Sequence, residues 1–513
     1  MNSFLTRFTI TKHRDAACRI VRSIPVFFCS TCRDIFGVYF ILMSFPLILI
    51  PSLQRLSYNE TEEMERRCGM SGRLLGKKLT SFQILILGFA SLILLGTLLL
   101  LLPFAAKSGT GVCLEHALFT ATSAVCVTGL VVQDTASCWS GFGQAVILAL
   151  IQVGGLGVVT FAAYISTVSG RKISLLQRSV LQDSFSAHQI GGVVRLTRFI
   201  LRTALTVETA GALIMLPFFC GRYGISGIWL AVFHSVSAFC NAGFDLMGDK
   251  TGPFSSLTSF ANHPGIVLPV CLLILAGGIG FLTWDDLAGN RLRFKRYRMQ
   301  TKVILAATGV LILIPALLLF FGEYANYPLG ERVWLSLFQS VTPRTAGFNT
   351  ADLNVLSGSG RLLIIALMLI GGSPGSTAGG MKNTTAAVLV LNALAVFRKK
   401  KSAYAFGRRI DDSAIKTAAT LLTMYLGLTL ISGAIISAVE TLPFGACLFE
   451  AASAIGTVGL SLGLTPYLGT ASHILLIGLM FFGRVGGLTL IYAAVSKTGN
   501  DGAQYPVEKI NVG

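Results

Sequence analysis

The tetrapeptide Val127-Thr128-Gly129-Leu130 has three counterparts later in the chain, at a spacing of roughly 110 residues. They are Asn241-Ala242-Gly243-Phe244, Thr345-Ala346-Gly347-Phe348 and Thr457-Val458-Gly459-Leu460. Each tetrapeptide follows an apolar run too short to cross a membrane, and these runs lie at 114–125, 228–239, 331–342 and 444–455. A long apolar segment precedes each run, and another follows each tetrapeptide. Four copies in the same order indicate an internal repeat.

A second glycine mark recurs in the long apolar segment that follows each tetrapeptide. Its copies are Gly154-Gly155-Leu156-Gly157, Gly277-Gly278-Ile279-Gly280, Gly371-Gly372-Ser373-Pro374-Gly375 and Gly483-Arg484-Val485-Gly486-Gly487. Each repeat is therefore predicted to contain an outer helix, a short descending helix, an extended glycine strand and an inner helix. We predict four tandem repeats at 82–169, 197–290, 301–397 and 412–497, with an N-terminal extension at 1–80 and a cytoplasmic tail at 498–513.

The composition is that of a membrane protein. Hydrophobic residues make up 53% of the chain and charged residues 12%, whereas soluble domains carry about 25% charged residues. The uncharged runs at 84–103 and 142–165 are long enough to cross a hydrocarbon core of ~30 Å as helices. Further runs lie at 303–321 and 362–375. We therefore predict an all-α polytopic membrane protein.

The net charge of +18 gathers in segments between the apolar runs, namely Arg171-Lys172, 291–302 and 398–409. Because two crossings per repeat return the chain to the same side, all of these linkers are predicted to face the cytoplasm, as the positive-inside rule requires. Topology and anionic membrane lipids explain the basic charge, so it does not indicate nucleic acid as a partner. The glycine motifs then lie near the outer face.

The eleven cysteines show no spacing typical of a metal site or of a disulfide framework. Cys113 and Cys138 bracket the first short run and tetrapeptide, and both are predicted to face outward. A disulfide between them is permitted there if their Cα atoms lie within about 7 Å. His234 is predicted to be packed or hydrogen-bonded and not to bind a metal.

The four glycine strands are predicted to surround one pore with pseudo-fourfold symmetry. Non-helical backbone is tolerated at membrane depth only where protein buries it or where it lines a wet cavity. Carbonyl oxygens in such strands can replace the hydration shell of a potassium ion, and the short helices would point their partly negative C-terminal ends at the pore. The predicted ion-binding residues are Val127, Thr128, Gly129, Asn241, Ala242, Gly243, Thr345, Ala346, Gly347, Thr457, Val458 and Gly459.

The third inner helix is predicted to be interrupted by an intramembrane loop at 371–383, because proline and glycine break helices. The predicted gate residues are Gly371, Gly372, Ser373, Pro374, Gly375, Ser376, Thr377, Gly379, Gly380, Lys382 and Arg484. An ordinary kinked helix is the alternative for the loop, and a cytoplasmic snorkelling anchor is the alternative for Lys382. Arg484 interrupts an apolar helix, where a charge usually faces a cavity or a partner. A salt bridge to Glu450 or Glu208 remains open, and these two acids are otherwise expected to be structural.

The motifs resemble those of the Trk/Ktr/HKT superfamily of potassium transporters over residues 75–513. The four resembling segments are Ser123 to Leu130, Phe239 to Asp245, Thr342 to Asn349 and Gly456 to Ser461, and the tail Tyr505 to Gly513 is similar to that of KtrB-type bacterial pore subunits. This resemblance implies a homodimer with one pore per protomer, gated by a cytosolic nucleotide-binding ring of the KtrA/TrkA type. It also implies a bacterial plasma membrane location, a loop that blocks the path, an arginine that faces the path, and an uptake that is often sodium-dependent.

The N-terminal extension contains a further uncharged segment at 35–53 with two prolines, Pro46 and Pro51. Basic residues flank it on both sides, and both flanks favour the cytoplasm. We therefore expect this segment to be peripheral or re-entrant, or to be absent if translation starts at Met70.

Two other classes of protein compete with a channel-like pore. A secondary transporter or an obligately coupled potassium/sodium symporter is the first, although inverted repeats would place their sites at mid-membrane. An intramembrane enzyme is the second, and it would require a Ser/His pair, paired aspartates or an H-E-x-x-H motif within helices. We find none of these, so we predict no enzyme and no organic cofactor.

Overall fold

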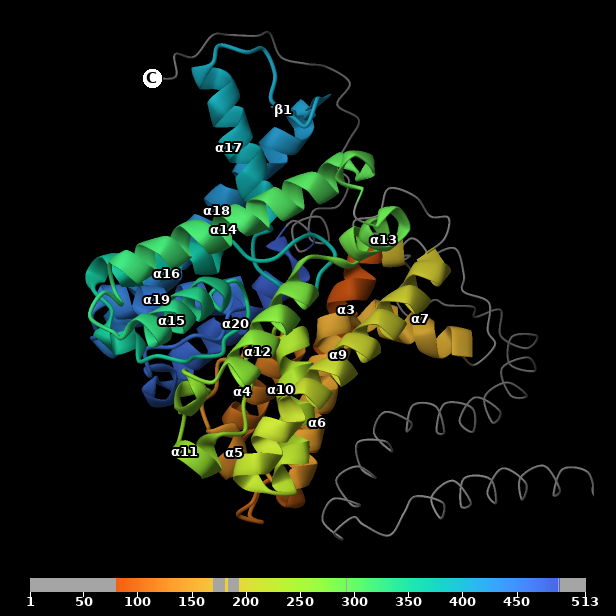
Figure 1. Ribbon diagram of the computed structural model, residues 1–513. Coiled ribbons are helices and arrows are strands. Elements are labelled where there is room, and N and C mark those ends of the chain that lie inside the picture. Colours follow the sequence, from red (N-terminus) through yellow and green to blue (C-terminus); the bar gives the residue numbers. More distant parts are fainter. Residues whose placement is uncertain (1–79, 169–179, 183–192, 292, 488, 490–513) are drawn as a thin grey trace, which may run out of the picture.

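The computed structural model describes residues 80–168, 180–182, 193–291, 293–487 and 489. These residues are mostly helical (Figure 1). Several predictions lie outside the described residues: the segment at 35–53, the start at Met70, most of the linker that follows Arg171, and the tail from Tyr505.

Four long helices occupy the places predicted for the outer helices. They are α3 (Ser81–Leu100), α9 (Val193–Tyr223), α14 (Met299–Phe321) and α18 (Asp412–Glu440). Each is long and apolar enough to cross a membrane, since 20 residues at 1.5 Å per residue span ~30 Å. Large apolar side chains such as Leu94 and Leu98 on α3 are more than half exposed, as expected of a surface that faces lipid.

Four short helices lie where the sequence predicts them. They are α4 (Leu114–Val125), α10 (Ser226–Phe239), α15 (Leu329–Val341) and α19 (Phe444–Gly456). None is long enough to span, and the last four residues of each are buried. Each contributes at least one fully buried phenylalanine to the main core; these are Phe119, Phe233, Phe239, Phe338 and Phe449. The short helices are thus held in the interior by their own apolar side chains.

The inner segments are broken more often than the sequence predicted. In the first repeat α6 (Gly141–Leu156) ends at Gly157, and α7 (Val158–Val168) follows. In the second, α12 (Pro264–Gly278) and α13 (Phe281–Asn290) meet at 96° beside Gly280. Both glycines have φ above +85°, a conformation that ends a helix and that side chains disfavour. The prediction of continuous inner helices in these two repeats is therefore wrong.

The remaining inner segments differ from each other. In the third repeat α16 (Gly358–Leu369) and α17 (Asn383–Phe397) are separated by irregular backbone at 370–382. In the fourth, α20 (Thr470–Val485) ends at Gly486, where φ is +92°. The irregular backbone at 370–382 lies where the sequence predicts the intramembrane loop at 371–383.

A hairpin follows α17 on the side of the basic linkers, formed by β1 (Tyr404–Ala405) and β2 (Arg408–Arg409). Together with the end of α17 it projects beyond the other helices (Figure 1). It has a small core of its own, formed by Ala395, Ala403, Ala405 and Ile410.

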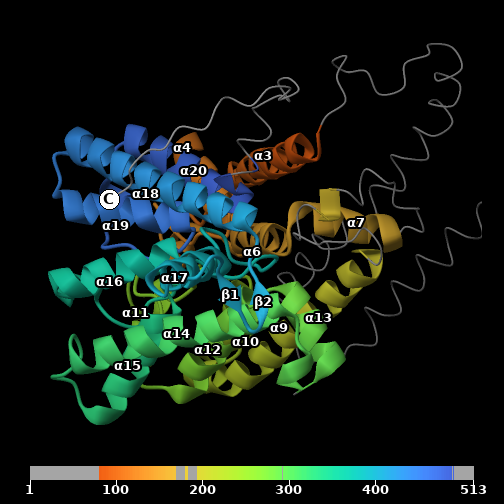
Figure 2. The same ribbon diagram turned by 90° about the horizontal axis from the view of Figure 1, so that it is seen from above.

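Shorter elements complete the described chain. They are α5 (Thr135–Cys138), α11 (Gly248–Thr251), and the 3-10 turns η1 (Pro103–Ala105), η2 (Thr258–Phe260), η3 (Phe294–Arg296), η4 (Leu353–Val355) and η5 (Thr465–Tyr467). Seen from above, the first and last repeats lie side by side, with α3 and α4 next to α20 (Figure 2).

Candidate functional site

The residue two positions before each motif glycine adopts a left-handed backbone. Val127, Asn241, Thr345 and Thr457 have φ between 50° and 72°. The motif glycines, Gly129, Gly243, Gly347 and Gly459, have φ between 69° and 93°. A left-handed conformation costs a side-chain-bearing residue roughly 1–2 kcal/mol, so it persists only where the surroundings impose it. All four strands therefore share one unusual backbone course.

The four motif glycines also meet in a closed cycle. A Cβ atom added to Gly129 would lie 2.4 Å from the carbonyl oxygen of Ala242 in the next repeat. The corresponding contacts are Gly243 to Ala346 at 2.7 Å, Gly347 to Val458 at 2.4 Å, and Gly459 back to Thr128 at 2.2 Å. Because any side chain here would overlap a neighbouring backbone oxygen, only glycine fits. The carbonyls of Thr128, Ala242, Ala346 and Val458 thus stand in one ring, which we call the carbonyl ring.

Hydroxyl groups on the short helices hold the strands in this course. Ser123 Oγ accepts a hydrogen bond from the Gly129 N–H at 3.1 Å, and Ser453 Oγ accepts one from the Gly459 N–H at 3.0 Å. In the middle repeats Ser237 and Thr342 donate to the carbonyls of Phe244 and Phe348. The sequence pattern indicated no role for these four hydroxyl groups, although three of them stand six positions before a motif glycine.

A hollow of about 330 Å³ is lined by all four motif glycines; it lies on the side of the strands that the sequence predicts to face outward, and we call it the outer hollow. Asp134, Asp245 and Asp352 also line it, so its charge favours cations. Burial raises the pKa of the Asp245 carboxyl to about 7, the Met247 N–H bond opposes this shift, and the negative charge of Asp134 adds to it. The sequence did not single out these acids.

A second hollow, of about 540 Å³, lies on the opposite side of the strands. Its lining includes Lys382, Arg484 and the breaks of the inner helices at Gly157 and Gly486. The loop residues Pro374 to Ser376 border it as well.

The irregular segment at 370–382 is bonded to the second and fourth repeats. The Ser373 and Thr377 N–H groups donate to the carbonyls of Gly278 and Gly277 at the end of α12. The Gly380 N–H donates to the Gly483 carbonyl on α20. A Cβ added to Gly379 would lie 2.2 Å from Oγ1 of Thr457, so the segment packs directly against the base of the fourth strand.

Arg484 joins this segment to the first repeat. Its guanidinium donates to the carbonyl of Thr377 in the segment, and to the carbonyls of Gly154 and Gly155 at the end of α6. The alternative of a salt bridge is wrong, because Glu208 accepts from Gln152, and Glu450 accepts from Ser461, Leu462 and Thr465.

The structure also decides the state of four further residues that the sequence singled out. Lys382 Nζ turns back onto the segment and donates to the Ala378 carbonyl at 2.9 Å, so it is not a snorkelling anchor. His234 Nδ1 contacts the Leu230 carbonyl and its ring stacks on Phe219, which confirms a packed histidine. Cys113 and Cys138 are free thiols, so the structure lacks the disulfide that we considered.

Arg344 is a residue whose environment the sequence did not reveal. It precedes the third strand, it is only 5% exposed, and its Nε has no hydrogen-bond partner among the described residues. Arg344 borders a small void. The C-terminal end of α12 borders this void as well, through Ile274, Leu275 and the following Ile279. The partly negative end of that helix favours a cation, which accounts for a buried guanidinium at this place.

Comparison with known proteins gives consistent matches over most of the chain. The family model TrkH, described as a cation transport protein, matches residues 77–502. The potassium/sodium uptake protein NtpJ of Enterococcus hirae is 39% identical over 85% of this chain and 98% of its own length. The Ktr system potassium uptake protein B of Bacillus subtilis is 38% identical over 85% of this chain and 97% of its own. The crystal structure of the potassium transporter TrkH from Vibrio parahaemolyticus has a TM-score of 0.66 and 20% identity, covering 92% of this chain and 99% of that one, and this likeness shows the fold.

Proposed function

The chain belongs to the TrkH family of cation transport proteins, and from this premise we propose that it takes up potassium through one channel-like pore. The resemblance drawn from its motifs is thereby confirmed. The chain is a multi-pass membrane transporter and not an enzyme, because its family is a transporter family. The two relatives described above are named as potassium or potassium/sodium uptake proteins.

The carbonyl ring is the observation that carries this proposal. In our account the four repeats stand with pseudo-fourfold symmetry around one axis, and the strands form the ion filter. The support is the cyclic order of contacts from Gly129 through Gly243 and Gly347 to Gly459 and back. Carbonyl oxygens placed in this way can replace the water around a cation. The three acids of the outer hollow would concentrate cations before they enter.

The segment at 370–382 acts in this account as the gate, and Arg484 holds it closed. The segment lies beside the base of the fourth strand at Thr457, and irregular backbone of this kind can adopt a second arrangement without unwinding a helix. Arg484 contributes a positive charge and also links the segment to α6. Both properties oppose the passage of a cation.

The partners proposed are a second copy of the chain and a cytosolic ring of the KtrA type. The relative from Bacillus subtilis is named as component B of a Ktr system. The exposed hairpin and the turn that joins it to α17 offer basic side chains to such a ring, namely Lys399, Lys400, Lys401, Arg408 and Arg409. We place the protein in a bacterial plasma membrane, with the basic linkers in the cytoplasm.

Obligate potassium/sodium symport is the second candidate, favoured by the name of the relative from Enterococcus hirae. Rubidium uptake into proteoliposomes, measured with and without sodium and with and without the ring, tests both. We expect uptake without sodium that the ring increases. An absolute requirement for sodium would favour the symporter, and no rubidium uptake under any condition would contradict both.

A further inference from the structure

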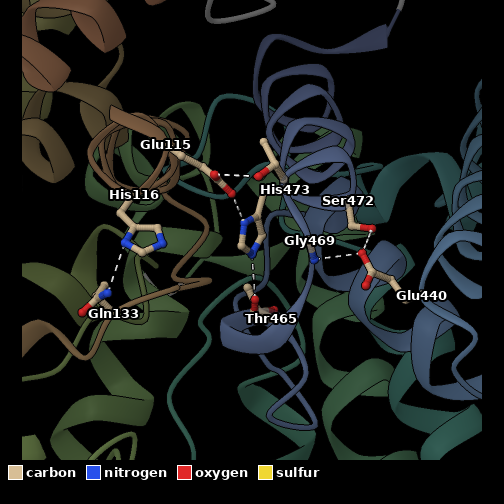
Figure 3. A network of polar contacts seen from close by, with 9 residues as sticks. Glu115, His116, Gln133, Glu440, Thr465, Gly469, Ser472 and His473 are labelled. Atoms are coloured by element: carbon tan, nitrogen blue, oxygen red, sulfur yellow. Dashed lines mark hydrogen bonds and ion pairs between the residues drawn. The ribbon is translucent and has the colours of Figure 1, made fainter. Parts of the chain in front are cut away.

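The first and fourth repeats close the cycle of repeats, although no linker joins them directly. Polar side chains of α4 and α20 meet at this seam (Figure 3). Glu115 in the first turn of α4 accepts hydrogen bonds from Thr470 Oγ1 at 2.8 Å and from His473 Nδ1 at 2.5 Å. The His473 side chain is only 3% exposed, whereas the Glu115 side chain is 28% exposed.

Both ring nitrogens of His473 face oxygen atoms that accept hydrogen bonds. Nδ1 faces the Glu115 carboxyl, and Nε2 lies 2.8 Å from the carbonyl oxygen of Thr465. A carbonyl cannot donate, so Nε2 must carry a hydrogen. Because a neutral imidazole has only one N–H, the contact at Nδ1 requires a second proton. The Glu115–His473 pair therefore holds one proton more than a neutral histidine beside an ionised glutamate.

The position of this proton follows from the surroundings. Hydrogen bonds from His473 and then from Thr470 hold the pKa of Glu115 below its usual range, and burial opposes them. The carboxyl is thus ionised, and the imidazole carries both protons. A cation in the first turn of α20 is disfavoured by the helix dipole, and Glu115 supplies the charge that offsets this cost.

The contact at Thr465 reaches the fourth glycine strand through one residue, Glu450. Thr465 Oγ1 donates to Glu450 Oε2 at 2.6 Å. Glu450 Oε1 accepts from Ser461 Oγ at 2.7 Å and from the Leu462 N–H at 2.9 Å. Ser461 is two residues beyond Gly459, so the strand, the fully buried Glu450 and η5 form one connected unit. Loss of the bond between His473 and Thr465 would release the outer end of that unit.

We propose that Glu115 and His473 are positioning residues for the fourth glycine strand, and that they act only while the pair holds its proton. This inference rests on the proposed potassium pore and adds to it a dependence of ion selectivity on the outside pH. When the outside pH rises and the proton leaves, either the Glu115 or the Thr465 contact must be lost. In the acid direction the contribution of the pair persists until the pH falls through the lowered pKa of Glu115.

The charged and titratable groups around the pair are few in the described residues. On α4 they are Glu115 and His116, and His116 bonds to Gln133. On α18 Glu440 accepts from the Gly469 N–H and from Ser472 Oγ (Figure 3). On α19 the nearest is Glu450. Glu440, like Glu115, accepts two hydrogen bonds from the start of α20 and the residue before it, but neither donor is a histidine. Glu440 is therefore a matched control for Glu115.

The experiment measures the reversal potential of the full-length protein in planar bilayers, with potassium on one side and sodium on the other. The pH at the outer face is varied from about 5.5 to about 9. The readout is the potassium-to-sodium permeability ratio. The size of the current is not used as the readout, because ionisation of Asp245 in the outer hollow changes the current over the same pH range. For wild type we expect this ratio to fall about fivefold as the pH rises, the effect of losing one ordinary hydrogen bond.

The variants separate positioning by the proton from simple loss of packing. His473→Gln should show at every pH the low ratio that wild type shows at alkaline pH. Glu115→Gln should keep the high ratio at every pH, because the introduced amide can donate to Nδ1 of a neutral imidazole whose Nε2–H still bonds Thr465. Glu440→Gln should keep the pH dependence. A wild-type ratio that is constant with pH would overturn the inference even if no variant folds, and so would full pH dependence in His473→Gln. Absence of any potassium-selective current in wild type would overturn the proposed pore as well, which distinguishes the two failures.

Discussion

Replacement of Arg484 tests how the gate is held closed. One guanidinium nitrogen donates to Thr377 in the irregular segment, and the other donates to Gly154 and Gly155 at the end of α6. Arg484→Gln removes the positive charge and also the pair of donor nitrogens that joins the segment to α6. Arg484→Lys keeps the charge, but its single nitrogen cannot bond both Thr377 and the end of α6 as the two guanidinium nitrogens do. The two variants therefore separate the link from the charge.

The expected magnitude follows from the bond between Arg484 and Thr377. A hydrogen bond to a charged group contributes about 1.5–3 kcal/mol. Because about 1.4 kcal/mol corresponds to a tenfold change in an equilibrium constant, loss of this bond should shift the segment toward the open arrangement by about 10- to 150-fold. Flux that is limited by the fraction of open pores should rise accordingly until most pores are open.

The assay is the initial rate of rubidium uptake into proteoliposomes without the cytosolic ring, on protein that elutes as a single species in size-exclusion chromatography. We expect both variants to raise the rate. A rise in Arg484→Gln alone would mean that only the charge opposes flux. Wild-type rates in both variants would refute the role of Arg484 in the gate.

Three further predictions concern the strands, the segment and the linker. Replacing any motif glycine with serine should lower the potassium-to-sodium permeability ratio in protein that still reaches the membrane, because a Cβ would lie within 2.7 Å of a carbonyl oxygen in the next strand; four variants that conduct like wild type would remove the filter assignment. Deleting part of 371–380 should raise rubidium flux and reduce its dependence on the ring, and unchanged flux in folded protein would make the segment a hinge only. Neutralising the exposed basic residues of the hairpin and of the turn before it should weaken co-purification with the ring, most clearly at low salt; these residues are Lys399, Lys400, Lys401, Arg408 and Arg409. Unchanged ring binding and unchanged stimulation of flux by the ring would mean that the ring acts through another part of the chain.

The short helices and the break in the third inner helix could be predicted because local sequence determines them. The run at 114–125 has the same bounds as α4, and an apolar stretch with a glycine motif behind it is a local pattern. The breaks at Gly157 and Gly280 were missed, although the same glycine mark stands there. A glycine inside an apolar run is compatible with a continuous helix, and only its packing decides that φ becomes positive.

The partners of the buried charged residues could not be predicted. Arg484 binds carbonyl oxygens, and every residue has a carbonyl, so no side chain in the sequence marks those positions. Glu450 was expected to be structural, but its connection to Thr465, and through it to His473, depends on contacts between the first and fourth repeats. A short-range pattern contains no information about which repeats meet.

If the proposed pore is right, the carbonyl ring binds the transported ion. Crystals grown in rubidium or thallium and measured near the absorption edge of that ion would show where the ion binds. We expect an anomalous peak on the axis of the four strands, within coordination distance of the carbonyl oxygens of Thr128, Ala242, Ala346 and Val458. An empty ring in crystals whose anomalous peaks lie elsewhere in the membrane region would contradict it.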